Sequence, residues 1–139
     1  MSYDADYVMC ECPLEPFKSF VEEIEKDYPV RIVKSPDVCL TMVRAEDSLE
    51  KQEFYLGEVL TTECEVEVQG EAGYGLCIGE EPVRGYCIAV MDALVRCAAD
   101  DRRIKEFLDG QAEAVHQSEK EEYARTLQTR VDFKLMEED

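Results

Sequence analysis

The chain has 139 residues, and its 33 acidic and 15 basic side chains give a formal net charge of −18. Binding to nucleic acid or to an anionic membrane surface is therefore not expected, because both need a basic patch. The length suits one domain, residues 1–139, and 45% apolar residues are enough for a hydrophobic core. The charge fits either a self-repelling surface in water or a docking face for a basic partner.

The sequence predicts a cytoplasmic protein. No apolar run approaches the roughly 20 residues that span a membrane. The first residues, MSYDADYVMCECPLEP, have neither the basic flank nor the apolar core of a signal peptide. We expect residues 1–13 to be loosely ordered.

The cysteine count is high and odd, and no C-x-x-C pair occurs. Buried free thiols are expected at Cys64, Cys77 and Cys87, which fall on apolar positions of strands or a helix. A metal or cluster held by Cys10, Cys12 and a distant cysteine is the alternative. His116 is the only histidine, so most zinc sites that use histidine are excluded, and no metal ligand is assigned.

The first third of the chain predicts a helix followed by two strands. Apolar residues recur at helical spacing between Glu15 and Asp27, and Pro29 ends that pattern. Residues 30–34 alternate as a short strand, and Ser35-Pro36-Asp37 predicts a turn. Residues 38–45 are apolar on both faces, which predicts a central strand covered on both sides.

The longest strand pattern covers residues 53–69. Its second half alternates strictly, so one face is expected in the core and the other in water. The core face has Cys64, Val66 and Val68, and the solvent face has Glu63, Glu65 and Glu67. Gly57 predicts a break or bulge before Glu58. Residues 69–73 predict a hairpin loop, and residues 74–78 the returning strand, with Tyr74, Leu76 and Ile78 on one face.

Helices are predicted to follow. Pro82 suits the first turn of a helix over residues 82–99. Its buried stripe is predicted to contain Val83, Cys87, Val90, Met91, Leu94 and Ala98. Residues 101–128 are also helical in pattern, as one helix or as two shorter ones separated near Gly110. Val131, Phe133 and Leu135 alternate as a small edge strand. The order predicts an α+β fold, a small antiparallel sheet with helices packed on one face.

The familiar catalytic motifs are missing from the sequence, including G-x-G-x-x-G, the Walker loop, G-x-S-x-G and H-E-x-x-H. Glu58 differs from the other glutamates of its strand because it follows Gly57. We expect it to be partly buried beside Arg44, either in a structural ion pair or in contact with a ligand or subunit. Asp92 lies near an apolar helical stripe, where a cap or an ion pair is the ordinary interpretation. For Arg130, a subunit contact and simple solvation both remain open, and His116 is expected on the surface.

The chain resembles PhnG, the G subunit of the bacterial carbon–phosphorus lyase core complex. The resemblance begins at Pro36-Asp37-Val38 and at a strand that ends in Arg44. It continues through Phe54-x-x-Gly57-Glu58-x-x-Thr61-Thr62, and through Gly73-Tyr74-Gly75 and Gly79. It closes with the helix motif at residues 89–94 and with Thr129-Arg130-Val131-Asp132-Phe133. Together these segments span roughly residues 30–136.

This resemblance implies a subunit that acts with an I-type subunit and with the H, J and L proteins. That assembly forms ribose 1-methylphosphonate 5-triphosphate from MgATP and methylphosphonate and releases adenine. MgATP is then a substrate of the complex, no cofactor belongs to this chain, and no catalytic residue is assigned. Arg44, Glu58, Thr61, Asp92 and Arg130 are the candidate contacts with substrate or subunits. A stand-alone binding or scaffold domain is the alternative, and a thiol redox enzyme is a weaker one.

Overall fold

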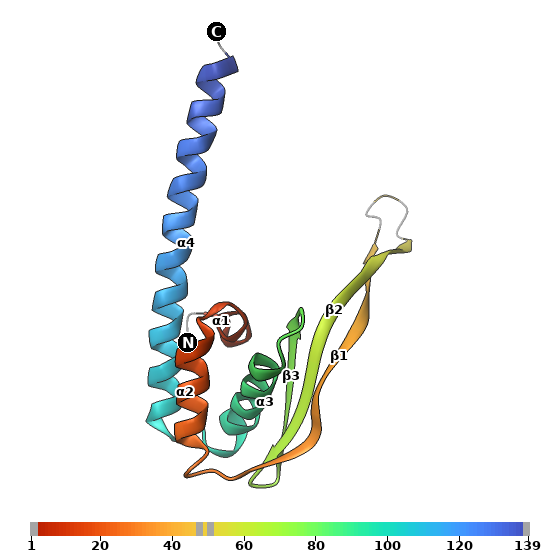
Figure 1. The fold of residues 1–139 in the computed structure, drawn as a ribbon, viewed down its shortest axis with the longest axis vertical. Coiled ribbons are helices and arrows are strands. Elements are labelled where there is room, and N and C mark those ends of the chain that lie inside the picture. The colour runs from red at the N-terminus through yellow and green to blue at the C-terminus, as the bar shows by residue number, and fades with distance from the viewer. Residues whose placement is uncertain (1–2, 47–48, 50–51, 138–139) are drawn as a thin grey trace. The chain divides into compact units, whose positions relative to one another are not determined.

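The computed structural model describes residues 3–46, 49 and 52–137, without the side chains of Tyr55 and of residues 130–137. The described chain divides into two compact units. The first combines the residues up to Cys12 with those from Lys105 onward, and the second covers Pro13–Ile104. The structure confirms the α+β class, with helices before and after an antiparallel sheet (Figure 1).

The second unit contains a three-stranded antiparallel sheet in the order β1-β2-β3. Its strands are β1 (Val30–Glu46), β2 (Glu53–Val68) and β3 (Glu71–Ile78). The central strand is β2, and β1 is an edge strand. The prediction of a central strand over residues 38–45 is therefore wrong. Both faces of residues 38–45 are apolar, but they are not both covered, since Leu40 and Met42 are largely exposed.

The turn predicted at Ser35-Pro36-Asp37 is also wrong, because β1 runs through this segment without ending. The register against β2 shifts between Ile32 and Lys34 and again between Lys34 and Asp37. An edge strand tolerates Pro36, because proline has no N–H to donate and the outer side of an edge strand has no neighbouring strand that needs one. Proline here marks an irregular strand rather than a turn.

The long strand β2 confirms the alternation read from the sequence. Cys64, Val66 and Val68 are fully buried, and the glutamates between them lie on the other face. Gly57 has a φ of 152°, which favours glycine, and the register shifts beside it between Val43 and Arg44. The predicted bulge before Glu58 is thus confirmed.

Helix α3 (Pro82–Cys97) covers one face of the sheet, and α2 (Leu14–Ile24) packs against α3 (Figure 1). The predicted buried positions of α3 are confirmed apart from Val83, which is 40% exposed. The buried surface is wider than one stripe and also includes Arg84, Gly85, Ile88, Ala89 and Ala93. This follows from the position of α3 between the sheet and α2, which leaves little of the helix facing water.

Two glycines of β3 allow α3 to approach the sheet closely. A Cβ atom at Gly73 would overlap the carbonyl oxygen of Ala89, and one at Gly75 would overlap that of Gly85. The glycines that the sequence analysis assigned to a hairpin therefore serve helix–sheet packing, with their backbone beneath the helix.

In the first unit, α1 (Ala5–Glu11) forms within the segment for which the sequence predicted little order. Asp4 caps it, because its carboxylate accepts a hydrogen bond from the Asp6 N–H at 3.0 Å. Helix α4 (Arg102–Glu137) is continuous, so a division near Gly110 is wrong. The strand predicted over residues 131–135 is wrong as well. Leu127, Val131 and Leu135 are also four residues apart, which suits a helix equally.

Candidate functional site

The sheet face that α3 covers continues beyond the helix as a two-stranded ribbon of β1 and β2 (Figure 1). Thr62 lies under the start of α3, where its Oγ1 accepts from the Glu81 N–H at 2.9 Å and donates to the Gly79 carbonyl at 2.6 Å. Beyond Thr62 the same face carries four exposed apolar side chains. We call Val38, Leu40, Met42 and Leu60 the apolar ribbon face.

Cross-strand register places these side chains together. Val38 lies opposite Thr62, Leu40 opposite Leu60, and Met42 opposite Glu58. Directly opposed residues share a face, as do residues two positions apart along a strand. Leu40 is 61% exposed and Met42 53% exposed. The continuation of a core face is thus open to water, which is unusual for a folded domain.

Glu58 stands on this apolar face, and its side chain is exposed. The expectation of a partly buried pair with Arg44 is not met, because the structure pairs Arg44 with Glu53 at 3.9 Å. The bulge at Gly57 explains the difference, since it sets Arg44 opposite Tyr55. Within the described residues, Glu58 has no ion-pair partner. A hollow of about 270 Å³ lies next to it, lined by Met42, Arg44, Glu53 and Phe54.

Thr61 is buried and faces the opposite side of the sheet from Thr62. Its hydroxyl is hydrogen-bonded to that of Thr41 at 2.8 Å and donates to the Cys39 carbonyl at 3.3 Å. Both contacts join β1 to β2, which gives Thr61 a structural part. Thr62, which the sequence analysis did not single out, positions the start of α3.

Asp92 ties α3 to β3. Its carboxylate accepts from the Tyr74 N–H at 2.9 Å and lies 3.1 Å from the Arg96 guanidinium. Arg96 in turn donates to the Ala72 carbonyl. The ordinary interpretation of Asp92, a pair with a basic side chain, is thereby confirmed. Arg130 lies in α4, but its side chain is outside the described residues.

Arg84 is a site residue that sequence reasoning missed. It is 7% exposed and its Nε lies 3.1 Å from Glu81, in the first turn of α3. A cation within an otherwise apolar helical run was the signal for it. Its partner Glu81 donates its N–H to Thr62, which puts Arg84 near the end of the covered sheet face, where the ribbon begins.

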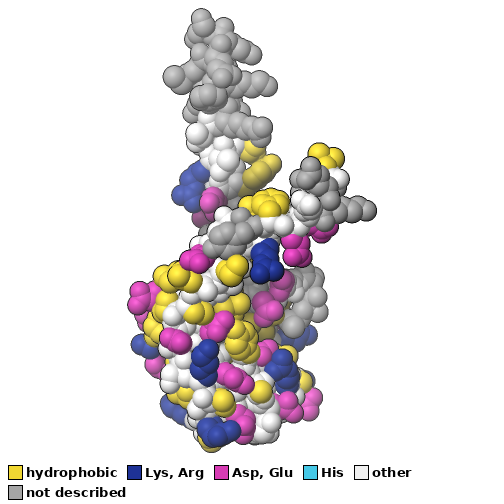
Figure 2. All heavy atoms as spheres, turned by 90° about the vertical axis from the view of Figure 1, so that its right-hand side faces the viewer, with side chains coloured by type: hydrophobic (Ala, Val, Ile, Leu, Met, Phe, Trp, Pro, Cys, Tyr) yellow, Lys and Arg dark blue, Asp and Glu magenta, His cyan; other side chains and the backbone are white. Residues whose placement is uncertain are grey.

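The outer face of the sheet, opposite α3, is a second uncovered surface. Tyr74, Leu76 and Ile78 are exposed there by 48%, 43% and 74%. Acidic side chains of β2 adjoin them, and two are paired: Arg31 with Glu67 at 2.7 Å and Lys34 with Glu63 at 3.2 Å. Figure 2 looks toward this side and shows apolar, acidic and basic side chains interspersed. Hydrogen bonds from Tyr74 and Lys34 lower the pKa of Glu63.

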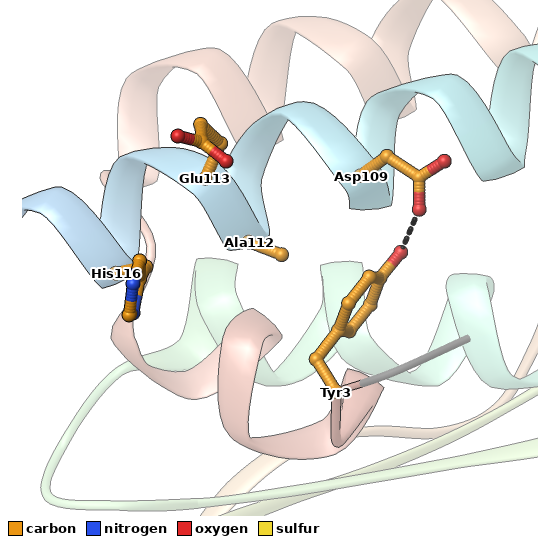
Figure 3. A pocket seen from close by; sticks show the side chains of 5 residues that line it. All are labelled: Tyr3, Asp109, Ala112, Glu113 and His116. Carbon is orange, nitrogen blue, oxygen red and sulfur yellow. Dashed lines mark hydrogen bonds between the residues drawn. The ribbon is translucent and has the colours of Figure 1, made fainter.

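The first unit has a pocket of about 450 Å³ on α4, lined by Tyr3, Asp109, Ala112, Glu113 and His116 (Figure 3). The Tyr3 hydroxyl donates to Asp109, and burial together with this bond raises the pKa of Tyr3 to about 12. His116 is exposed, as predicted. Within the described part of the chain, no three His, Cys, Asp or Glu side chains gather as metal ligands would.

Cys39, Cys64 and Cys97 are free thiols in the structure. Cys64, Cys77 and Cys87 are buried as the sequence predicted, and Cys12 is buried with them. Burial raises the pKa of the Cys64 thiol, which keeps it protonated and unreactive. Among the described helices, none has the length and apolar character to cross a membrane.

These features define a small α+β protein whose sheet leaves apolar side chains uncovered on both faces. The chain belongs to the family described as phosphonate metabolism protein PhnG, whose family model matches residues 6–137. A search of curated proteins gave no match. The family places the chain in phosphonate metabolism, and the resemblance read from its motifs is confirmed.

Proposed function

We propose that this chain is a non-autonomous subunit of a cytoplasmic carbon–phosphorus lyase complex. In that assembly it helps to form ribose 1-methylphosphonate 5-triphosphate from MgATP and methylphosphonate, with release of adenine. Its principal partner is an I-type subunit, alongside the H, J and L proteins. The support is the family match over residues 6–137, which covers nearly the whole chain.

The structural observation that carries a subunit role is the apolar ribbon face. An apolar surface that continues a core face outside the core is typical of a surface that a partner covers. Burying such side chains stabilises an interface by about 25 cal/mol per Å² of apolar area. Leu40 and Met42 do not have this stabilisation while they are exposed to water. A partner that covered them would supply it, so the chain is suited to act within an assembly.

The charges on the ribbon favour assembly over substrate binding. In its described segments, residues 38–46 and 52–60, Arg44 is basic whereas Glu46, Glu53 and Glu58 are acidic. MgATP and methylphosphonate are anionic, and carboxylates repel such ligands. We therefore assign Arg44 and Glu58 to contact with a partner subunit rather than to placement of the substrate. Arg44 is exposed and only 3.9 Å from Glu53, so it can exchange that pair for a partner's carboxylate.

Reconstitution tests this function. The I-type subunit and the H and L proteins are incubated with MgATP and methylphosphonate, with or without this chain, and released adenine is measured by chromatography. We expect adenine release to require both this chain and its partners. Equal rates of adenine release with and without the chain would contradict the proposal, and a chain that stays monomeric beside the I-type subunit would favour the stand-alone scaffold.

A further inference from the structure

The apolar ribbon face lies directly in line with the surface under α3. The first turns of α3 end that covered surface, because Glu81 and Gly85 both lie against Thr62. From Val38 to Arg44 the ribbon extends about 20 Å further at about 3.3 Å per residue. A helix of about 13 residues, or between three and four turns, has the same length.

The chemistry of this surface combines an apolar strip with the carboxylate of Glu58. Leu40, Met42 and Leu60 surround the position of Glu58, which lies opposite Met42. In the described part of the chain no cation neutralises this carboxylate. A partner that buried the strip without supplying a positive charge would leave the carboxylate desolvated and unpaired, which is costly. The occupant therefore needs apolar side chains together with a Lys or Arg.

Electrostatics also argue against a second copy of this chain as the occupant. Each copy has a net charge of −18. Two ribbons placed face to face would bring two Glu58 carboxylates together within one apolar contact, and like charges there cost several kcal/mol. A partner element with basic flanks is instead attracted by the negative electrostatic potential of this acidic chain.

We propose that the apolar ribbon face binds an amphipathic helix of the I-type subunit, in line with α3, and that a Lys or Arg of this helix pairs with Glu58. This rests on the proposed function, because it names the contact through which that subunit is held. A helix is the fitting occupant, since a sheet face is covered by side chains and the same face is covered by a helix where it meets α3.

The ribbon supplies only part of the interface. A stable contact between two proteins buries about 800 Å² on each partner, whereas one short helix on four apolar side chains buries less. The helix contact therefore acts as an anchor within a larger interface. Its loss should weaken the complex without abolishing every contact between the subunits.

Site-specific photocrosslinking tests the position and nature of the occupant. A benzophenone amino acid replaces Leu40 in the full chain, and the reconstituted complex with the I-type subunit is irradiated and analysed by peptide mass spectrometry. The same amino acid at Glu65, on the outer face, is the matched control. We expect Leu40 to crosslink to one I-subunit segment with apolar residues three and four apart and flanking Lys or Arg, and Glu65 not to crosslink to that segment. Crosslinks from Leu40 to this chain itself, to a segment without that pattern, or to nothing would overturn the proposal.

A charge exchange tests the pair at Glu58. Glu58→Lys should weaken binding of the I-type subunit by about tenfold or more, whereas Glu65→Lys should change it less than threefold. Replacement by Glu of the basic residue nearest the crosslink should restore binding to Glu58→Lys. Failure of that rescue, or equal effects of both Lys variants, would reject the pair even though the complex forms. If wild-type subunits form no complex, both this inference and the proposed function fail. Circular dichroism of each variant verifies that the chain is folded.

Discussion

At the scale of single residues, small side chains determine how α3 sits on the sheet. Gly75 leaves no space for a Cβ atom, because the Gly85 carbonyl and the Ala89 backbone occupy that position. Gly110, in contrast, lies in α4 with nothing within 4 Å of a built Cβ. Packing of α3 on the sheet therefore requires glycine at position 75, whereas glycine at position 110 lowers the stability of the helix.

Gly75→Ala should lower the free energy of unfolding by about 1–3 kcal/mol, since the helix must move away from the strand. Gly110→Ala should raise it by about 0.5–1 kcal/mol, because alanine favours the helix and restricts the unfolded chain. Urea unfolding followed by circular dichroism measures both. A stabilising Gly75→Ala would mean that α3 does not rest on β3 as described.

Thr62 provides a second prediction at this scale. Its hydroxyl satisfies the Glu81 N–H and the Gly79 carbonyl, and the side chain is fully buried. Thr62→Val retains the shape but leaves both backbone groups unpaired, so we expect a loss of about 1–3 kcal/mol in unfolding free energy. Thr126→Val, on an exposed part of α4, is the control and should cost little. Similar losses in both variants would argue against this role.

At the scale of elements, the start of α4 is held by a cluster around Asp101. Its carboxylate accepts from the Arg103 N–H at 2.9 Å and from the Tyr28 hydroxyl at 2.9 Å, while Arg103 also reaches Asp27 at 2.6 Å. The hydrogen bonds from Arg103 hold the pKa of Asp101 well below its usual range. The cluster joins the chain after α2 to the first turn of α4.

A lowered pKa in the folded state means that Asp101 adds stability above its unfolded pKa, about 3.9. That stability is lost as the pH falls toward the folded pKa, where the folded carboxylate is finally protonated. Asp101→Asn should therefore lower the thermal midpoint at pH 7, and the difference from wild type should shrink below about pH 4. Melting curves across pH 3–7 measure this. A difference that stays constant with pH would show that the carboxylate charge is not what matters.

The sequence predicted an element correctly where its residue pattern fitted only one structure, and failed where the pattern fitted two. The alternation of Cys64, Val66 and Val68 has a single interpretation, and it was confirmed. The apolar residues of β1 also fill both faces of a strand, yet they lie on an uncovered edge strand. The prediction failed because an apolar pattern does not distinguish a core face from a surface that a partner covers. The last part of α4 matched both the strand and the helix periods, and only tertiary structure decides between them.

The candidate site was harder to predict from the sequence than the fold. The sequence set Glu58 apart as partly buried, whereas its side chain is exposed, because its environment depends on the bulge at Gly57 and on where α3 ends. Thr62 gave a weak signal, because its importance comes from hydrogen bonds with Gly79 and Glu81. Such contacts join residues that are distant along the chain, and residue spacing does not reveal them.

At the scale of the whole molecule, we propose that another protein covers the part of the sheet that α3 leaves open. Its acidity, its family and its apolar ribbon face all agree with a subunit of a phosphonate-metabolising assembly. The ribbon is then a connection to the partner, and α3 with the covered sheet is the core that holds it in place.

The most direct test is the dissociation constant of this chain for the I-type subunit, measured by calorimetry for wild type and for the double variant Leu40→Glu with Leu60→Glu. Both positions are exposed, so the double variant should fold, and two carboxylates on the ribbon should oppose an apolar contact. We predict a stoichiometric complex for the wild type and binding at least about 100-fold weaker for the double variant. No wild-type complex, or equal affinity for both proteins, would contradict the account.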